Sequence, residues 1–294
     1  MKNEGSINPK MRIKKIKIYI AHMPTLSTTV TKVMEICNRP DTLPNDLNRV
    51  ISLDPVLTGQ VLKLINSAYY SLPNKITSLT RAIIMLGLNT VKNLALSSSV
   101  LKNIRANNGN QSVFMDIFWA HSLCVGVTAK ALAAINGIPI NEREEYFVAG
   151  LVHDLGKIPL LSSYPEEYFQ IFELAKTEQS HLKEAEKNIF NIDHCHVGKI
   201  IAKKWKLNSA VSECLEYHHS PQDSSPENYN LIKTVSLADI YANLLEKGLA
   251  EQNPFDKSIE DQILNDMGVS QDILIDLRST VLDQIEKSKV FLEI

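Results

Sequence analysis

Apolar residues recur at helical spacing along nearly the whole of this 294-residue chain, and this periodicity restricts the fold to a helical one. The clearest case follows Asp54-Pro55, where an aspartate suited to capping a helix precedes a proline suited to its first turn. Leu57, Val61 and Leu64 then form one apolar stripe. The sequence has no strand pattern of weight and no internal repeat. We therefore predict an all-α fold, a multi-helix bundle.

Several further helices have recognisable ends. Ser78 is expected to cap a short helix that Gly87 stops, and Asn141 to cap a helix whose first-turn glutamates suit its positive end. A helix is also expected from Asn89. The remaining helices are expected over 113–134, 193–205, 209–219, 230–246 and 271–291. Residues 158–192 are expected to form a loop, either a lid or a wall.

A polar, glycine-containing segment over 103–112 lacks periodicity and predicts a linker. It divides an N-terminal helical lobe, residues 20–102, from a histidine-rich bundle, residues 113–245. Residues 1–19 are expected to be an N-terminal extension. Residues 246–294 are expected to form a C-terminal helical extension that packs back on the body.

Composition excludes several classes of protein. The chain is 44% apolar and 22% charged, with a formal charge of −2, which argues against a dedicated nucleic-acid binder. No apolar stretch approaches the length needed to cross a bilayer, and no signal peptide is recognisable. Its four cysteines have no paired spacing, so we expect reduced thiols in a cytoplasmic protein. Cys195, between two histidines, could bind metal, but a small buried residue is the favoured interpretation.

Histidines are concentrated in one third of the chain, since seven of the eight fall between residues 121 and 219. His153 and Asp154 sit side by side at the end of an apolar helix, where a buried ionisable pair is costly unless a metal compensates it. Imidazole and carboxylate groups from several helices could converge on iron, manganese or zinc. The candidate metal ligands are His121, His153, Asp154, His194, His218, His219 and Asp239.

The alternative is that each histidine is a hydrogen-bonded core residue, with His218 and His219 placed at a helix C-terminus that favours imidazolium. His22, His181 and His196 are assigned to that simpler interpretation. A bound metal could activate water for attack on phosphorus. Lys157 could then contact a phosphate oxygen or, equally, cap a helix. No Gly-rich phosphate loop is present.

Residues 78–98 also have the outline of a helix-turn-helix, which would place Asn89, Thr90, Lys92 and Asn93 at a major groove. The second helix is apolar or small on all sides, and basic residues around it are sparse. We therefore consider DNA binding the weaker interpretation.

Several blocks of this sequence are similar to the HDOD family, bacterial signalling relatives of the HD metal-dependent phosphohydrolases. In the first half they are Leu53–Leu57 (LDPVL), Leu62–Tyr70 (LKLINSAYY), Ile76–Leu88 (ITSLTRAIIMLGL) and Asn93–Leu96 (NLAL). In the second half they are Asp193–Gly198 (DHCHVG), Trp205–Leu207 (WKL) and His218–Pro221 (HHSP). The resemblance covers roughly residues 20 to 245. It implies an all-helical HD-like fold and a regulatory role exerted through protein contacts.

The resemblance also implies a ligand set. His121 matches the first histidine of the HD superfamily, His153-Asp154 the pair that names it, and Asp239 its final aspartate. The histidines at 194, 218 and 219 match extra histidines of the related HD-GYP phosphodiesterases. No Gly-Tyr-Pro follows them and Ile117 replaces an acidic ligand, so cyclic di-GMP hydrolysis is not supported.

Two hypotheses follow for function. The first is a bacterial, cytoplasmic signalling module, non-catalytic, with a retained metal and a signalling protein as its partner. The second is an active metal-dependent phosphohydrolase acting on a nucleotide or phosphodiester. An enzyme needs an open coordination position and a cleft for phosphate, whereas a scaffold has a closed site.

Overall fold

The computed structural model of the chain describes residues 9–23, 26–68, 70, 72–104, 112–140, 142–178, 182–245 and 263–288. Over these residues the regular structure is helical and no strand is present, so the predicted all-α fold is confirmed. The helices are α1 Pro9–His22, α2 Thr28–Cys37, α3 Pro44–Ile51, α4 Pro55–Ile65, α5 Leu79–Leu86, α6 Leu88–Ile104, α7 Ser112–Ile135, α8 Arg143–Val152, α9 Lys157–Ser163, α10 Pro165–Glu178, α11 Leu182–Phe190, α12 His194–Trp205, α13 Ser209–Tyr217, the 3₁₀ turn η2 Pro221–Asp223, α14 Tyr229–Leu244 and α16 Gln271–Ser288.

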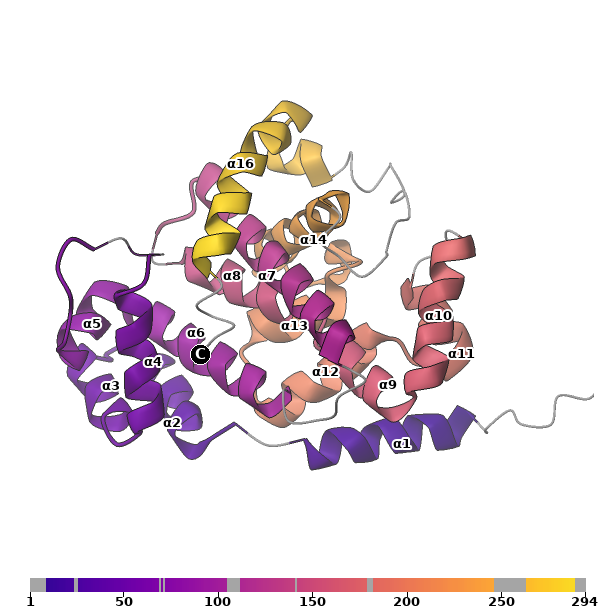
Figure 1. Cartoon of the computed structure of the whole chain (residues 1–294), viewed down its shortest axis with the longest axis horizontal. Helices are drawn as coiled ribbons and strands as arrows, with labels where there is room; N and C mark the ends of the chain where they lie inside the picture. Colours follow the sequence, from indigo (N-terminus) through magenta and orange to yellow (C-terminus); the bar gives the residue numbers. More distant parts are fainter. Residues whose placement is uncertain are drawn as a thin grey trace, which may run out of the picture.

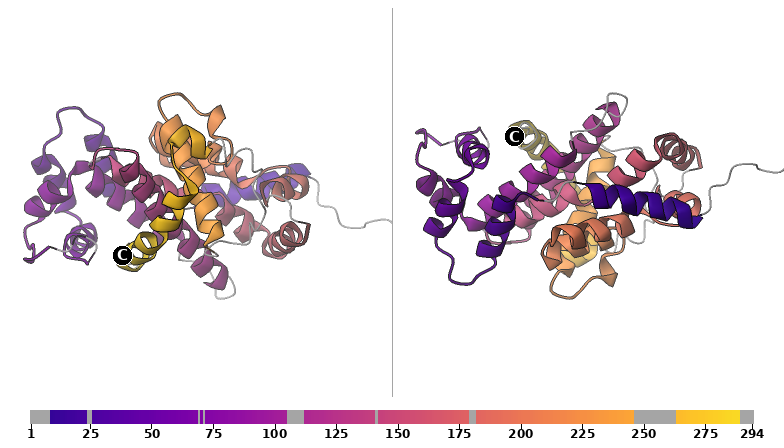
Figure 2. Two further views of the ribbon diagram at one scale, coloured as in Figure 1. Left: turned by 90° about the horizontal axis from the view of Figure 1, so that it is seen from above. Right: turned by 90° about the horizontal axis from the view of Figure 1, so that it is seen from below.

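Helices α2 to α6 form a lobe at one end of the molecule (Figure 1 and Figure 2). Its helix boundaries follow the predicted signals. The Asp54 carboxylate accepts a hydrogen bond from the Leu57 amide, and the Ser78 hydroxyl accepts one from the Arg81 amide. Gly87 ends α5 with a φ of 81°, a left-handed conformation that favours glycine. Helix α6 then runs from the lobe to pack against α8.

The centre of the bundle is a close crossing of α7 and α8, with α14 packed on both. Gly126 on α7 and Gly150 on α8 face each other at this crossing. A Cβ on Gly150 would lie 2.8 Å from the Gly126 Cα, and a Cβ on Gly126 would lie 2.7 Å from the Phe147 carbonyl oxygen. The two backbones can therefore approach this closely only because neither glycine has a side chain.

Helix α7 is longer and more apolar than we expected. Its Phe114–Ile135 portion has the length and composition of a membrane-crossing helix, so the expectation that no stretch approaches that length is wrong. The protein buries 72% of its most apolar 18-residue window. Packing against α8, α14 and α16 accounts for this apolar composition.

The segment predicted as a loop over 158–192 is largely helical and contains most of α9 together with α10 and α11. These helices form one flank of the bundle (Figure 1). Helix α1 lies along α9 and reaches α11. The Lys204 ammonium of α12 donates hydrogen bonds to the carbonyls of Ile20, Ala21 and Met23, at the C-terminus of α1.

Thr90, Lys92 and Asn93 are buried in α6, which agrees with treating DNA binding through a helix-turn-helix as the weaker interpretation. Asn141 lies outside the described residues, and the N-cap position of α8 is Glu142, without a side-chain hydrogen bond. Part of the predicted linker, 105–111, also lies outside the described residues.

Candidate metal centre

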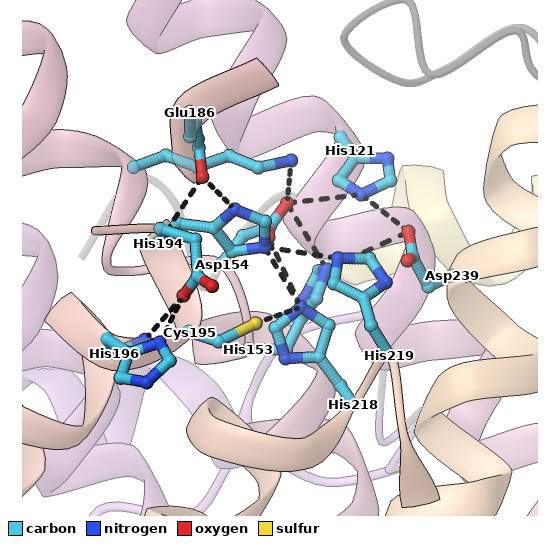
Figure 3. Close-up of polar contacts among 12 residues, drawn as sticks. His121, His153, Asp154, Glu186, His194, Cys195, His196, His218, His219 and Asp239 are labelled. Carbon is cyan, nitrogen blue, oxygen red and sulfur yellow. Dashed lines mark hydrogen bonds and ion pairs between the residues drawn. The ribbon is translucent and has the colours of Figure 1, made fainter. Parts of the chain in front are cut away.

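All seven predicted ligands lie in one cluster at the middle of the bundle (Figure 3). They come from five places in the fold. His121 lies on α7 and His194 begins α12, while Asp239 lies on α14. The remaining four lie just after helices: His153 and Asp154 after α8, His218 and His219 after α13. Their role as ligands stays a prediction, but their convergence is a feature of the structure.

The turn that carries His153 and Asp154 rests against the start of α12. A Cβ on Gly156 would lie 1.8 Å from the His194 carbonyl oxygen, a distance that no side chain permits. The glycine after the His-Asp pair is therefore required for the pair to reach α12.

Asp154 stands between two groups of imidazoles. Its Oδ2 atom lies 3.3 Å from His153 Nε2 and 3.7 Å from His121 Nε2. Asp239 Oδ1 completes this group, 3.1 Å from His121 Nε2 and 3.8 Å from His153 Nε2. We call these four residues the first position.

The other Asp154 oxygen faces a second group. Asp154 Oδ1 lies 3.5 Å from His194 Nε2 and 3.6 Å from His218 Nε2. The Nε2 atom of His219 lies 3.1 Å from that of His194. We call His194, His218 and His219 the second position. Asp154 thus offers one oxygen to each position.

Hydrogen bonds behind the cluster orient three of its imidazoles. Nδ1 of His153 lies 2.7 Å from the Gly150 carbonyl, and Nδ1 of His218 lies 2.9 Å from the Cys214 carbonyl. Nδ1 of His194 lies 2.6 Å from a carboxylate oxygen of Glu186. Each partner is an acceptor, so Nδ1 carries the proton and Nε2 presents a lone pair to the centre. This is the arrangement of metal-binding histidines.

The cluster fits a cation. The Nε2 atom of His153 and the Oδ1 atom of Asp154 are buried without a hydrogen-bond partner. The Nε2 lone pairs of His194 and His218 face each other across 3.4 Å. Buried lone pairs placed in this way repel each other unless a proton or a metal ion lies between them. Imidazoles and carboxylates together suit iron, manganese or zinc.

The electrostatics of the metal-free cluster indicate the same need for positive charge. Burial lowers the pKa of His153, but Asp154 and Asp239 outweigh burial and raise it to about 10. Burial and the neighbouring imidazolium of His218 hold the pKa of His219 well below its usual range. In the absence of metal, some imidazoles of the cluster are thus protonated while others are held neutral. A divalent ion would supply the positive charge near the carboxylates and would also bind the lone pairs of the neutral imidazoles.

His22 and His196 lie outside the cluster, as expected. His196 has a side chain that is 64% exposed and bonds to Asp193, while His22 is exposed and bonds to the Ile18 carbonyl. His181 lies outside the described residues. Lys157 is buried, with its ammonium 2.7 Å from Asp154 Oδ2, and its contact with a phosphate oxygen stays a prediction.

Sequence reasoning missed Glu186 and the direction of Cys195. Glu186 is fully buried on α11, in a segment that was interpreted as a loop. An amphipathic pattern over 182–190 was the signal that could have found the helix, although not the target of its glutamate. Cys195 is buried, as expected, but its Sγ atom lies 4.0 Å from His218 Nε2.

Residues 23–221 match the HDOD domain family. The chain belongs to this family. The predicted resemblance is therefore confirmed. A curated relative of this HDOD chain, an uncharacterized protein of Treponema pallidum (strain Nichols), is 24% identical over 227 residues. The match covers 77% of this chain and 43% of the relative, so the chain spans less than half of that protein's length.

Solved structures share the fold. An HDOD domain protein of unknown function from Geobacter sulfurreducens is 24% identical, with a TM-score of 0.73 over 97% of this chain and 99% of that one. A candidate signal transduction protein from Marinobacter aquaeolei VT8 is 17% identical, with a TM-score of 0.74 over 99% and 67%. A candidate metal-dependent phosphohydrolase from Shewanella amazonensis SB2B is 22% identical, with a TM-score of 0.66 over 97% of each chain.

Proposed function

We propose that this HDOD chain is a non-catalytic regulatory module that acts through contacts with a protein partner and holds divalent metal in its buried centre. His121, His153, Asp154 and Asp239 would hold metal at the first position. His194, His218 and His219, with the second oxygen of Asp154, would hold it at the second. A bound ion would supply positive charge that stabilises the bundle, since the free energy of structural metal binding adds to that of folding.

The observation that carries the non-catalytic assignment is the burial of the cluster. As whole residues, His121, His153, Asp154, His194, His218 and Asp239 are each only 1–2% exposed, and only His219 is half-buried. A phosphohydrolase needs an open coordination position and a cleft that admits a phosphate group. The burial of six of the seven predicted ligands therefore favours a structural metal centre.

Exposed apolar side chains on the lobe support a role in protein contacts. Leu53 is 81% exposed, Ile84 61% and Val56 57%, and they lie between α3 and α4, on α5 and at the start of α4. Exposed apolar side chains of this size on the lobe are candidates for contact with a protein partner. The name of the Marinobacter relative points in the same direction.

The test uses the purified full chain and combines metal analysis with an activity screen. We would measure bound metal by mass spectrometry and assay phosphodiesterase and phosphatase turnover on nucleotides and phosphodiesters with Mn²⁺ or Fe²⁺. Asp154→Asn is compared with Asp223→Asn, an exposed aspartate on η2. We expect metal in the wild type and in Asp223→Asn, less metal in Asp154→Asn because the first position loses a ligand, and no turnover that depends on Asp154.

The alternative is a metal-dependent phosphohydrolase for a nucleotide or phosphodiester. It is favoured by the placement of Asp154 between two positions and by the partial exposure of His219. The Shewanella relative carries that description. Turnover that disappears in Asp154→Asn would establish this alternative. A protein without metal that is equally stable with and without a chelator would remove the metal centre from both accounts.

A further inference from the structure

Cys195 is the second residue of α12, directly after His194, and only 2% of it is exposed. Its Sγ atom points toward the second position (Figure 3). Sγ and the ligand nitrogens of His194, His218 and His219 all lie within 4.8 Å of one another. This thiol was not among the predicted ligands, and the resemblance to the HD superfamily does not supply it.

Three of the six distances among these four atoms are close to the edges of a coordination tetrahedron. Bond lengths to zinc of about 2.1 Å for nitrogen and 2.3 Å for sulfur place two nitrogens ~3.4 Å apart and a nitrogen and a sulfur ~3.6 Å apart. The observed distances from His194 Nε2 are 3.4 Å to His218 Nε2 and 3.1 Å to His219 Nε2. Cys195 Sγ lies 4.0 Å from His218 Nε2. Small side-chain shifts would bring all four to a shared ion.

We propose that the Cys195 thiolate is a metal ligand, and that His194, Cys195, His218 and His219 together form a zinc-selective site. The inference rests on the proposed metal centre and deepens it by naming the metal of one position. Iron and manganese in hydrolytic centres are held by imidazole and carboxylate, whereas a thiolate ligand favours zinc.

With the thiolate as fourth ligand, the second position would have a complete coordination shell. Three imidazoles and one sulfur satisfy the four coordination bonds that zinc makes in structural sites, and Asp154 Oδ1 lies beside them as a further donor. This leaves no coordination position for water or substrate. The second position would therefore cross-link the start of α12 to the end of α13 rather than activate a nucleophile.

A simple hydrogen bond is the competing role for this sulfur. At 4.0 Å an S–H group directed at His218 Nε2 is at the limit of hydrogen bonding. It would also occupy the lone pair that faces His194. Cys37 offers a contrast, because its sulfur donates to the Leu88 carbonyl in the lobe.

Cobalt(II) is the probe that distinguishes these roles, since a thiolate–cobalt bond gives a near-ultraviolet charge-transfer band that nitrogen and oxygen ligands do not. The full chain, freed of metal by a chelator and kept reduced with a phosphine, is titrated with Co²⁺. We expect the band in the wild type and in Cys37→Ala. It should be absent in Cys195→Ser and Cys195→Ala, with zinc affinity at the second position lowered ~10-fold or more.

A second measurement does not depend on the variants folding. Alkylation of each cysteine in the wild type is followed by mass spectrometry with and without Zn²⁺, and we expect zinc to protect Cys195 while leaving the rate at Cys37 unchanged. Cobalt uptake without the charge-transfer band, or a band that persists in Cys195→Ser, would overturn the thiolate assignment and leave the metal centre standing. A wild-type chain that takes up neither cobalt nor zinc would overturn both.

Discussion

Glu186 shows how a single residue outside the ligand set can control it. One carboxylate oxygen lies 2.7 Å from the backbone nitrogen of His194 and 2.6 Å from its Nδ1. The other accepts a hydrogen bond from the Tyr168 hydroxyl at 2.7 Å. The carboxylate thereby fixes the ring that presents Nε2 to the second position. Partners of this kind raise the basicity of a ligand imidazole.

Glu186→Gln is expected to weaken metal binding at the second position about 10–100-fold, because a neutral amide polarises His194 less than a carboxylate does. Competition with a chromophoric chelator measures the affinity. Glu184→Gln, two residues away and exposed, is the matched control and should bind as the wild type does. Equal affinities for the two variants would mean that Glu186 serves only the packing of α11.

At this scale the sequence was informative where a polar residue interrupts an apolar helix. Asp239 was proposed because an unpaired carboxylate in an otherwise apolar helix would be costly, and His121 because it belongs to the histidine-rich third of the chain. Glu186 and Lys157 carry no such signal, since glutamate and lysine are ordinary surface residues. The direction of a long charged side chain depends on neighbours that only the folded chain supplies.

Among the elements, the crossing of α7 and α8 places His121 near His153. Gly126 and Gly150 set the distance between the two helices, because the backbones meet where both side chains are missing. Wider spacing would separate His121 and Asp239 from the His153-Asp154 turn. The geometry of the first position therefore depends on two residues that bind nothing.

Gly150→Ala should destabilise the fold by about 1–3 kcal/mol, because the new methyl group would lie 2.8 Å from the Gly126 Cα and must displace α7. Metal content should fall with it. Gly59→Ala is the control, since nothing lies within 4 Å of a Cβ there, and it should be neutral or stabilising by up to ~1 kcal/mol. Chemical denaturation gives both values; a stable Gly150→Ala with full metal content would contradict this account.

Helix boundaries with local signals were predicted well, and those that depend on packing were not. Asp54 and Ser78 cap their helices as expected, because capping needs only neighbouring amides. The three helices within 158–192 were missed because their apolar faces are short and are interrupted by charged residues. The role of Gly150 was not anticipated either. A helical glycine has an ordinary φ, so its importance depends on the helix opposite.

At the scale of the whole molecule, α1 packs against the bundle, although the lobe formed by α2 to α6 follows it directly in the sequence. Helix α1 lies along α9. At the C-terminus of α1, the ammonium group of Lys204 on α12 donates hydrogen bonds to three carbonyls at 2.6–2.8 Å. Arg12 adds a hydrogen bond to the carbonyl of Ile189, near the C-terminus of α11. Helices distant in sequence are thus tied together at one flank.

Lys204→Met should cost about 1–3 kcal/mol, since it removes charged hydrogen bonds to the last carbonyls of α1. Thermal unfolding measures the loss, and limited trypsin digestion should cut the exposed lysines of α1 more rapidly. Lys203→Met, the exposed neighbour, should change neither result. Similar digestion patterns for the two variants would indicate that packing on α9 alone holds α1 in place.

The distribution of the seven clustered groups along the chain has a consequence for assembly. His121 and Asp239 stand at opposite ends of the histidine-rich part, so their meeting requires that nearly all of it has already been arranged. An ion that needs both cannot nucleate the fold and must enter late. Once bound, the ion would slow unfolding, because these helices could not open even partly without breaking bonds between the ion and its ligands. Its main effect would then be on the lifetime of the native state rather than on the speed of reaching it.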